Sequence, residues 1–279
     1  MKQKLFEQLS DVKTPVAVGD RVRVILEEDR GVIEERLPRK NLLARPSPGD
    51  PGILKVTAAN IDRLVIVVSA RMPPLRTGLI DRFLVTAERQ DMLPLIVVNK
   101  CDLAARESLL ERLKVYGTMG YEIVFTSAKT GDGVERLLSL LKSGTSLLVG
   151  HSGVGKSSLM NRLDPDLALR TGTVAKHGRG RHTTTSVSLW RLPHGGHVVD
   201  TPGLRGFGLI DVPAPELAIL MPDLCPFTSG CRFPDCTHDH EPDCAVRAAV
   251  EREEVSADRY DSYLRMLRGI QGKEDPDEM

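Results

Sequence analysis

The sequence predicts a multidomain α/β protein, and three observations support this fold class. Residues 1–57 contain short alternating segments that favour a small, OB-like β-barrel. Residues 58–205 alternate apolar strands with helical segments, which is typical of a mainly parallel sheet with helices on both faces. Residues 206–279 combine a cysteine cluster with helical spacing of apolar residues, which indicates a separate helical domain.

The composition is that of an ordinary soluble protein. The 279 residues include 38 Lys+Arg and 38 Asp+Glu, so a case for a nucleic-acid partner must come from local clusters. No apolar run approaches the length of a membrane span, and the N-terminus lacks the apolar core of a signal peptide. We therefore expect a cytoplasmic protein that does not contact membranes.

The N-terminal segment has room only for a cramped or incomplete barrel. Residues 16–26 and 32–37 read as two strands joined by a polar turn. A complete five-stranded barrel would need roughly 50–70 residues. A basic cluster begins at the end of the second strand and contains Arg36, Arg39, Lys40 and Arg45. These residues fit either an exposed solubilising loop or a contact with the phosphate backbone of RNA, and the sequence leaves both readings open.

The middle of the chain alternates strands and helices in order. The apolar run at 64–69 is typical of a buried parallel strand, and the spacing of apolar residues over 79–89 predicts a helix. The remaining predictions are strands at 95–98, 122–125 and 145–149, helices at 105–116 and 133–142, and a hairpin over 186–192 and 196–199.

Two short motifs lie where successive predicted strands end. The first is Asn99-Lys100-Cys101-Asp102, the N-K-x-D pattern with which GTPases read guanine, and the second is Ser127-Ala128-Lys129. The Asp102 carboxylate can accept hydrogen bonds from the ring N–H and the exocyclic amine of guanine, which adenine does not offer. Because the carboxyl ends of parallel strands meet at one edge, we expect one base pocket there. The alternative is a helix N-cap at Asp102 beside an ordinary turn.

A glycine-rich loop between a predicted strand and a predicted helix matches the phosphate-binding pattern G-x-x-x-x-G-K-[ST]. Its glycines let backbone N–H groups point at a polyphosphate, and the helix N-terminus adds partial positive charge. Lys156 would reach the terminal phosphates, and the Ser157 hydroxyl would bind Mg²⁺. A purely structural turn is the alternative. The predicted nucleotide-binding residues of this loop are Gly150, His151, Ser152, Gly153, Val154, Gly155, Lys156, Ser157 and Ser158.

The predicted hairpin ends in a D-x-x-G pattern at residues 200–203. A strand-end Asp200 suits a water-mediated contact with Mg²⁺, and Gly203 could offer its backbone N–H to the γ-phosphate. The polar, glycine-rich segment 171–185 precedes the hairpin. One of its threonines, Thr183, Thr184 or Thr185, could supply a second hydroxyl to Mg²⁺, and we take Thr184 as the candidate.

The group that orients the attacking water is harder to assign. GTPases usually carry a glutamine just after the glycine of D-x-x-G, but here Leu204 follows and cannot hydrogen-bond through its side chain. His182 in the facing loop is our candidate for the catalytic residue, and contact with solvent or RNA is its alternative role. We therefore expect slow turnover by the isolated protein.

The C-terminal part contains a C-x4-C-x-H-x5-C cluster, formed by Cys231, Cys236, His238 and Cys244. Three thiolates and one imidazole close a structural, tetrahedral Zn²⁺ site with no open position for chemistry. We predict one such ion per chain, with helices over 244–252 and 257–270 around it. A disulfide is the alternative, although a cytosolic chain disfavours it, and His240 is an alternative ligand.

These motifs occur in a circularly permuted order, because N-K-x-D and Ser-Ala-Lys precede the phosphate loop and D-x-x-G. Together with residues 38–41 (Pro-Arg-Lys-Asn), residues 178–185 and the cysteine cluster, they closely resemble the bacterial ribosome small subunit-dependent GTPase A family, over about residues 15–270. The resemblance implies an OB barrel, a circularly permuted P-loop GTPase domain and a C-terminal zinc domain. It also implies slow GTP hydrolysis, stimulated by the 30S subunit during its late maturation.

On this resemblance we expect a monomer that uses GTP or GDP with Mg²⁺ and binds the small (30S) ribosomal subunit and its rRNA. Two other functions stay open, namely a P-loop ATPase or kinase, against which Asn99 and Asp102 argue, and a non-catalytic, GTP-dependent RNA-binding scaffold. Because D-x-x-G leads directly into the zinc domain, we also expect nucleotide state to reorient that domain through residues 204–215. The candidate RNA contacts are Arg36, Arg39, Lys40, Arg179 and Arg181.

Overall fold

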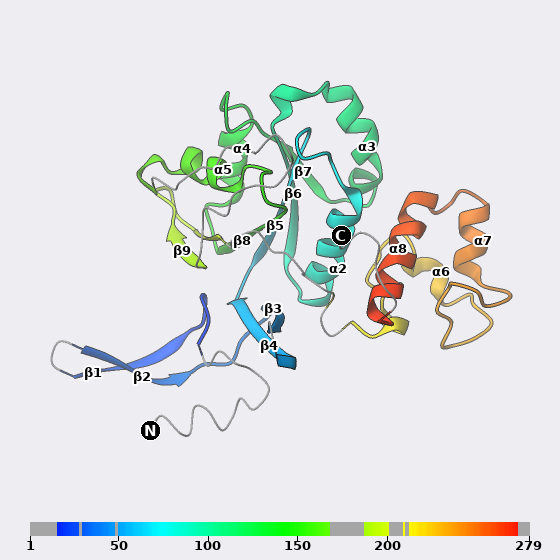
Figure 1. Cartoon of the computed structure of the whole chain (residues 1–279), viewed down its shortest axis with the longest axis horizontal. Coiled ribbons are helices and arrows are strands. Elements are labelled where there is room, and N and C mark those ends of the chain that lie inside the picture. The colour runs from blue at the N-terminus through cyan, green and yellow to red at the C-terminus, as the bar shows by residue number, and fades with distance from the viewer. Residues whose placement is uncertain are drawn as a thin grey trace.

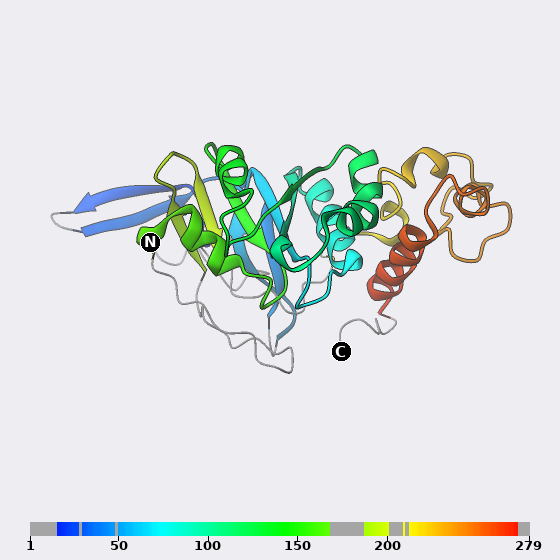
Figure 2. The same cartoon turned by 90° about the horizontal axis from the view of Figure 1, so that it is seen from above.

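The structure is a computed structural model, and it describes residues 16–27, 30–47, 50–167, 187–200, 209 and 212–272. The molecule is elongated (Figure 1). Seen from above, a β-hairpin projects at one end, the α/β domain lies in the middle, and the C-terminal helices lie at the other end (Figure 2). None of the helices in the described parts of the chain has both the length and the apolar character needed to cross a membrane.

The middle domain is built on a six-stranded sheet with the order β7-β6-β5-β8-β10-β9. Neighbouring strands are parallel, except for β9 and β10, which form an antiparallel hairpin. The parallel strands therefore bring their carboxyl ends to one edge, where ligands bind in open α/β sheets. The strands are β5 (Arg63–Ser69), β6 (Leu93–Asn99), β7 (Glu122–Phe125), β8 (Thr145–Val149), β9 (Ser188–Arg191) and β10 (His197–Asp200).

Helices cover both faces of this sheet (Figure 1). On one face lie α2 (Thr77–Arg89) and α3 (Arg106–Thr118), and on the other lie α4 (Val134–Leu140) and α5 (Lys156–Leu163). Strand β5 shows why, because Leu64, Ile66 and Val68 pack into the first core while Val65 and Val67 pack into the second. A strand buried on both faces needs the continuous apolar run that the sequence shows. The predicted mainly parallel sheet is therefore confirmed.

The N-terminal strands form two separate two-stranded antiparallel sheets. One pairs β1 (Val22–Glu27) with β2 (Arg30–Arg36), and the other pairs β3 (Leu42–Ser47) with β4 (Asp50–Ala59). A parallel bridge between Val18 and Ala58 adds one further contact. Across residues 16–27, 30–47 and 50–59 the strands do not close into a barrel, so the expected OB-like barrel is not seen. Closure requires each strand to have neighbours on both sides, whereas each of these strands pairs with one other strand and β4 adds only the single bridge to Val18.

The C-terminal domain contains α6 (Cys225–Thr228), α7 (Ala245–Glu251) and α8 (Ala257–Ile270). Its core includes Leu217, Met221, Val246 and Tyr263, and Val85 of α2 packs into the same core. The domain therefore shares an apolar contact with the sheet domain. Short 3₁₀ segments occur at Cys101–Leu103, Pro165–Leu167 and Ala214–Glu216.

A buried ionic cluster also joins the C-terminal domain to the sheet domain. Arg259 of α8 is 3% exposed and pairs with Asp81 of α2. Its guanidinium also donates two hydrogen bonds, of 2.7 and 2.8 Å, to Asp223. The hydroxyl of Tyr116 on α3 donates to Asp81 at 2.6 Å. Because the charges satisfy one another inside the protein, this Arg259 cluster fixes α8 against α2 and α3.

Candidate nucleotide site and metal centre

The glycine-rich loop lies between β8 and α5, and two of its glycines are required by close contacts. Gly150 has a φ of 143° and Gly155 a φ of 99°. A Cβ atom at Gly150 would lie 2.1 Å from the carbonyl oxygen of Val67, and one at Gly155 would lie 2.3 Å from the Nδ2 atom of Asn99. Any larger residue would push the loop away from its neighbouring strands.

Lys156 begins α5 and folds back over the loop. Its Nζ atom donates to the carbonyls of Gly150 at 2.7 Å and His151 at 3.1 Å. Burial lowers the pKa of Lys156 to about 8, while the charge of Asp200 acts in the opposite direction. A phosphate beside this ammonium would favour its charged form in the same way. The ammonium therefore lies within the loop that is proposed to receive the phosphates.

Asn99 joins the two sets of motifs into one site. Its Nδ2 atom donates to the carbonyl of Val154 in the phosphate loop at 2.9 Å. Its Oδ1 atom accepts from the backbone N–H of Ala128 at 3.1 Å. Asn99 is 1% exposed, so these bonds are shielded from water and are costly to leave unmade. The N-K-x-D, Ser-Ala-Lys and phosphate-loop segments therefore meet around this one side chain.

The other two characteristic residues of the N-K-x-D motif lie next to Asn99. Lys100 donates from Nζ to the carbonyls of Gly153 and Met72, both at 2.6 Å. Ser127 donates from its hydroxyl to Asp102 at 2.7 Å and thereby orients that carboxylate. Ser127 is buried, whereas Asp102 and Lys129 are exposed and accessible to a base.

Asp200 ends β10 beside the phosphate loop. The register pairs Asp200 with Leu148, two residues before Gly150. Asp200 is 2% exposed, and its charge acts on Lys156. The structure thus brings the start of D-x-x-G to the phosphate loop, as the motif predicts. Gly203, His182, Thr184, Arg179 and Arg181 lie outside the described residues.

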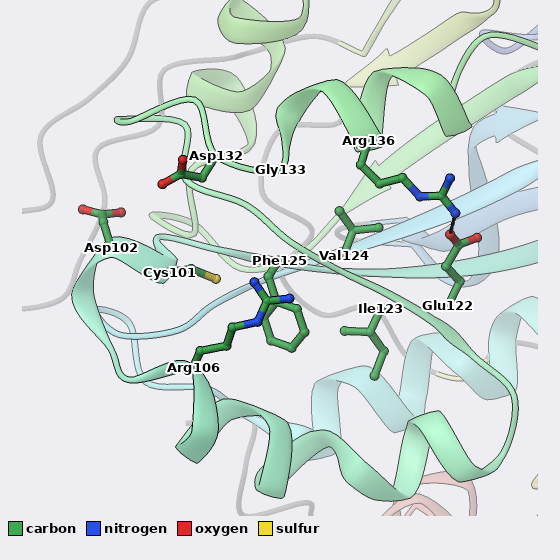
Figure 3. Close-up of a pocket in the computed structure, with 10 residues that line it drawn as sticks. All are labelled: Cys101, Asp102, Arg106, Glu122, Ile123, Val124, Phe125, Asp132, Gly133 and Arg136. Carbon is green, nitrogen blue, oxygen red and sulfur yellow. Dashed lines mark hydrogen bonds and ion pairs between the residues drawn. The ribbon is translucent and has the colours of Figure 1, made fainter.

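A cavity of about 560 Å³ lies beside this site, along the edge strand β7 and between residues of α3 and α4. Figure 3 shows Arg136 directed at Glu122, with which it forms a 2.7 Å ion pair. It also shows Arg106 beside Phe125, with the guanidinium 5.1 Å from the ring centroid. Asp102 lines the cavity, whereas Asn99 and the phosphate loop do not, so the cavity adjoins only one end of the N-K-x-D motif.

The predicted metal ligands Cys231, Cys236, His238 and Cys244 converge, with all four ligand atoms within 4.8 Å of one another. The sulfurs of Cys231 and Cys244 are 3.9 Å apart, and they lie 3.4 and 3.5 Å from Nδ1 of His238. Bonds of about 2.3 Å to sulfur and 2.0 Å to nitrogen give sulfur–sulfur and sulfur–nitrogen edges of about 3.8 and 3.5 Å in a tetrahedron. The donor set and its spacing therefore fit Zn²⁺.

The alternatives for this cluster are not supported. All five cysteines are free thiols, so the disulfide reading fails. His240 is exposed and lies outside the cluster, whereas His238 is 4% exposed. Burial raises the pKa of Cys236 to about 12, so this thiol needs a cation beside it to ionise.

Hydrogen bonds hold the backbone around the ligands. Tyr260 and Tyr263 of α8 donate to the carbonyls of His238 and Thr237, at 2.5 and 2.7 Å. Glu241 accepts from Thr237 and from neighbouring backbone N–H groups. Burial acts to raise the pKa of Glu241, but these bonds outweigh it and lower the pKa to about 2. The ligand loop is therefore fixed to α8.

The basic residues after β2 do not share one environment. Arg39 forms two 2.7 Å hydrogen bonds with Asp20, and its side chain is 7% exposed. This pairing favours a structural role for Arg39 over a contact with RNA. Lys40 is more accessible, with a 54% exposed side chain 3.8 Å from Asp62, and Arg36 is half-buried.

The motifs did not reveal the loop between β5 and α2. Its residue Met72 supplies a carbonyl to Lys100, although Met72 belongs to no nucleotide-binding motif. A signal for a turn exists, because Met72 is followed by Pro73 and Pro74 at a predicted strand end. That signal predicts a turn but not its contact with Lys100.

Comparison with known proteins places these features in a family. The chain matches the model of the RsgA GTPase family over residues 36–210. The chain belongs to the RsgA GTPase family. It is 44% identical over 264 residues to the small ribosomal subunit biogenesis GTPase RsgA of Haemophilus influenzae (strain 86-028NP), which covers 91% of this chain and 75% of that protein. A protein of the same name from Actinobacillus succinogenes is 43% identical over 261 residues, covering 90% and 74%.

Solved structures support the same assignment. The crystal structure of YjeQ from Thermotoga maritima has a TM-score of 0.74 and 38% identity, covering 93% of this chain and 86% of that one. YloQ, described as a circularly permuted GTPase, has a TM-score of 0.70 and 32% identity, covering 94% and 83%. As a member of the RsgA GTPase family, this chain is a GTP hydrolase with a circularly permuted fold, so GTP and GDP are its ligands.

Proposed function

We propose that this GTPase binds the small (30S) ribosomal subunit and assists its late maturation, with slow hydrolysis of GTP to GDP and phosphate alone and faster hydrolysis on the particle. The contact of Asn99 with the phosphate loop carries the nucleotide part, because it unites base-reading and phosphate-binding segments. The names of the relatives from Haemophilus influenzae and Actinobacillus succinogenes support the ribosomal part.

Each nucleotide-binding segment has a proposed role. Asp102 accepts from the two guanine N–H groups, Asn99 and the 127–129 segment hold the rim of the base pocket, and the stem of Lys100 packs on the base. Residues 150–158 surround the phosphates, with Lys156 neutralising their charge. The exposure of Asp102 and the position of Lys156 within the loop support these roles.

Mg²⁺ is the second proposed ligand, and it would neutralise charge on the phosphates. Ser157 would bind it directly, Asp200 through a water molecule, and Thr184 with its hydroxyl. The placement of Asp200 beside the phosphate loop supports this set. His182 is proposed to orient the attacking water, and Gly203 to contact the γ-phosphate.

The remaining proposals concern the parts of the chain and its partners. Residues 1–57 form the N-terminal domain, 58–205 the GTPase domain and 206–279 the zinc domain, with one structural Zn²⁺ per chain. We propose Arg36, Lys40, Arg179 and Arg181 as contacts to rRNA, and action as a monomer in the cytoplasm. The exposure of Lys40 supports its inclusion.

The test is the rate of GTP hydrolysis with and without purified small subunits, for wild type, Lys156→Ala and His182→Ala. We expect stimulation of the wild type by the particles, near loss of activity in Lys156→Ala, and a lowered kcat with unchanged nucleotide affinity in His182→Ala. A wild type that binds both GTP and the particles without hydrolysis would instead support the RNA-binding scaffold. No effect of the particles on the rate would contradict the proposal.

A further inference from the structure

Lys100 is held by two carbonyls from different parts of the site. One belongs to Gly153 in the phosphate loop and the other to Met72 in the loop between β5 and α2. Lys100 has a φ of 63°, a left-handed conformation that is uncommon outside glycine. Its ammonium contacts both carbonyls, and one of them comes from a segment that no nucleotide motif contains.

Ser69 holds the turn that carries the second carbonyl. It ends β5, is 1% exposed, and donates from its hydroxyl to the carbonyl of Arg71 at 2.6 Å. The same hydroxyl lies 3.4 Å from the carbonyl of Met72. The next residue, Ala70, donates its backbone N–H to the carbonyl of Asn99 at 2.8 Å. The turn is thus attached to the strand end that carries N-K-x-D.

The turn needs this support because Met72 has a φ of 57° and a 57% exposed side chain. A left-handed, non-glycine residue persists when its surroundings hold it. The far end of the loop is held as well, since Arg112 of α3 donates to the carbonyl of Leu75 at 2.9 Å. The loop is therefore fixed on both sides of Met72.

We propose that Ser69 is a positioning residue for guanine-nucleotide binding. By holding the turn at Arg71 and Met72, it places the Met72 carbonyl where that carbonyl accepts from Lys100, so that the lysine stem lies ready to pack on the base. This inference rests on the proposed role of Lys100 and adds the β5–α2 loop as a wall of that site. A side chain held at its tip before binding loses less conformational freedom when it packs on the base, so affinity rises through pre-organisation.

Ser69→Ala removes one hydroxyl and leaves the rest of the side chain in place. We expect it to weaken GDP binding about three- to tenfold, the size of one lost hydrogen bond. Packing of a lysine stem does not depend on the substituents of the base. The affinity for IDP, which lacks the exocyclic amine, should therefore fall by the same factor and leave the GDP-to-IDP ratio unchanged.

A double-mutant cycle tests whether Ser69 acts through Lys100. Titration of full-length, zinc-loaded protein with fluorescent mant-GDP gives Kd for wild type, Ser69→Ala, Lys100→Met and the double variant. Lys100→Met keeps an unbranched apolar stem and removes the ammonium. In that background Ser69→Ala should change Kd by less than about twofold. An equal loss of affinity in both backgrounds would overturn the proposal.

A matched control is Ser139→Ala on α4. The Ser139 hydroxyl also donates to a backbone carbonyl, that of Arg136 at 2.7 Å, but on an exposed helix surface. Its loss should leave Kd unchanged. Failure of the wild type to bind mant-GDP would contradict the proposed function itself, whereas binding with an additive cycle would contradict only the role of Ser69.

Discussion

The C-terminal helices and the β1–β2 hairpin, at opposite ends of the molecule, are held in different ways. At the C-terminal end, Arg259 is buried and its charge is satisfied by Asp81 and Asp223. At the N-terminal end, the ion pair of Arg23 and Glu35 on the β1–β2 hairpin has side chains that are 62% and 48% exposed. Exposed pairs contribute little, whereas a buried cluster is costly to break. The C-terminal helices are therefore firmly anchored to the sheet domain, and the hairpin has weaker support.

The hairpin also exposes apolar side chains. Val24 and Leu26 lie on one face with Ile33, which pairs with Val24 in the register. Leu26 is 82% exposed, and the other two are each 44% exposed. An isolated two-stranded hairpin is marginally stable in water. The comparison thus predicts local unfolding at the N-terminal end at a much lower free energy than at the C-terminal end.

The largest expected effect is that of removing zinc. Without the ion, three thiols and one imidazole lose the contact that holds residues 231–244, and α7 and α8 should lose protection in hydrogen exchange. The β1–β2 hairpin should exchange at an unchanged rate, because no zinc ligand touches it. Hydrogen exchange read by mass spectrometry before and after chelation measures both. Equal loss of protection in the hairpin and in the C-terminal helices would contradict the claim that the two ends are stabilised independently.

The second effect is that of Arg259→Leu, which leaves Asp81 and Asp223 without their cation. Breaking a buried pair in this way typically costs about 3–5 kcal/mol of unfolding free energy. The C-terminal helices should therefore detach from α2 and unfold at a lower denaturant concentration. Denaturant titration followed by hydrogen exchange in α8 measures the change. A loss below about 1 kcal/mol would show that apolar packing alone holds the domain.

The third effect is at the N-terminal end and depends on pH. Burial acts to raise the pKa of Asp20, but hydrogen bonds from Arg39 and from the backbone of Ala17 outweigh it and lower the pKa. The unfolded state therefore takes up the proton more readily, so this pair adds stability above about pH 3.9 that is lost as pH falls. Asp20→Asn should abolish this acid dependence in hydrogen exchange of residues 16–27. An unchanged acid profile would contradict the assignment.

The smallest effect is that of Arg23→Leu, the matched control for Arg259→Leu. Both variants remove an arginine that pairs with carboxylate, but Arg23 and Glu35 remain in contact with water. We expect a change in unfolding free energy of about 0.5 kcal/mol or less. A loss of unfolding free energy as large as that of Arg259→Leu would show that the exposed pair stabilises the hairpin as much as the buried cluster stabilises the C-terminal helices.

Anchoring of the zinc domain bears on the expectation that nucleotide state reorients it through residues 204–215. Most of that segment lies outside the described residues. The Arg259 cluster attaches α8 to α2 and α3, which flank the N-K-x-D strand rather than D-x-x-G. We therefore expect a nucleotide-dependent movement of the domain either to break this cluster or to carry α2 and α3 along. Crosslinking α8 to α2 should suppress the first kind of movement.

The sequence predicted the parallel sheet and the C-terminal helices well, because their patterns follow from burial. The strand at 122–125 and the helix at 257–270 match β7 and α8 residue for residue. Strands β3 and β4 had no prediction, since Pro46, Pro48, Pro51 and Gly52 interrupt the alternation that marks a strand. There, pairing between the two strands overrides local preference.

The candidate site was predictable from the sequence where side chains of a required type form it. It was not predictable where backbone carbonyls make the contacts. Asn99 and Lys156 both bond to the phosphate loop. Separately, the four predicted metal ligands lie together in the C-terminal part of the chain. The role of the Met72 carbonyl leaves no trace in residue identity, because every residue carries such a carbonyl. Arg39 shows the opposite case. Its place in a basic cluster suggested an accessible side chain, but that side chain is 7% exposed and pairs with Asp20.

The central claim is that two sets of motifs, given in permuted order, build one guanine-nucleotide site. The most direct test is the affinity of wild type and Asp102→Asn for GDP and XDP, measured by calorimetry on zinc-loaded protein with Mg²⁺. The account predicts that wild type prefers GDP and that Asp102→Asn loses at least about 100-fold in GDP affinity while gaining affinity for XDP, because an amide donor suits the extra carbonyl of xanthine. Unchanged GDP affinity in Asp102→Asn would contradict it.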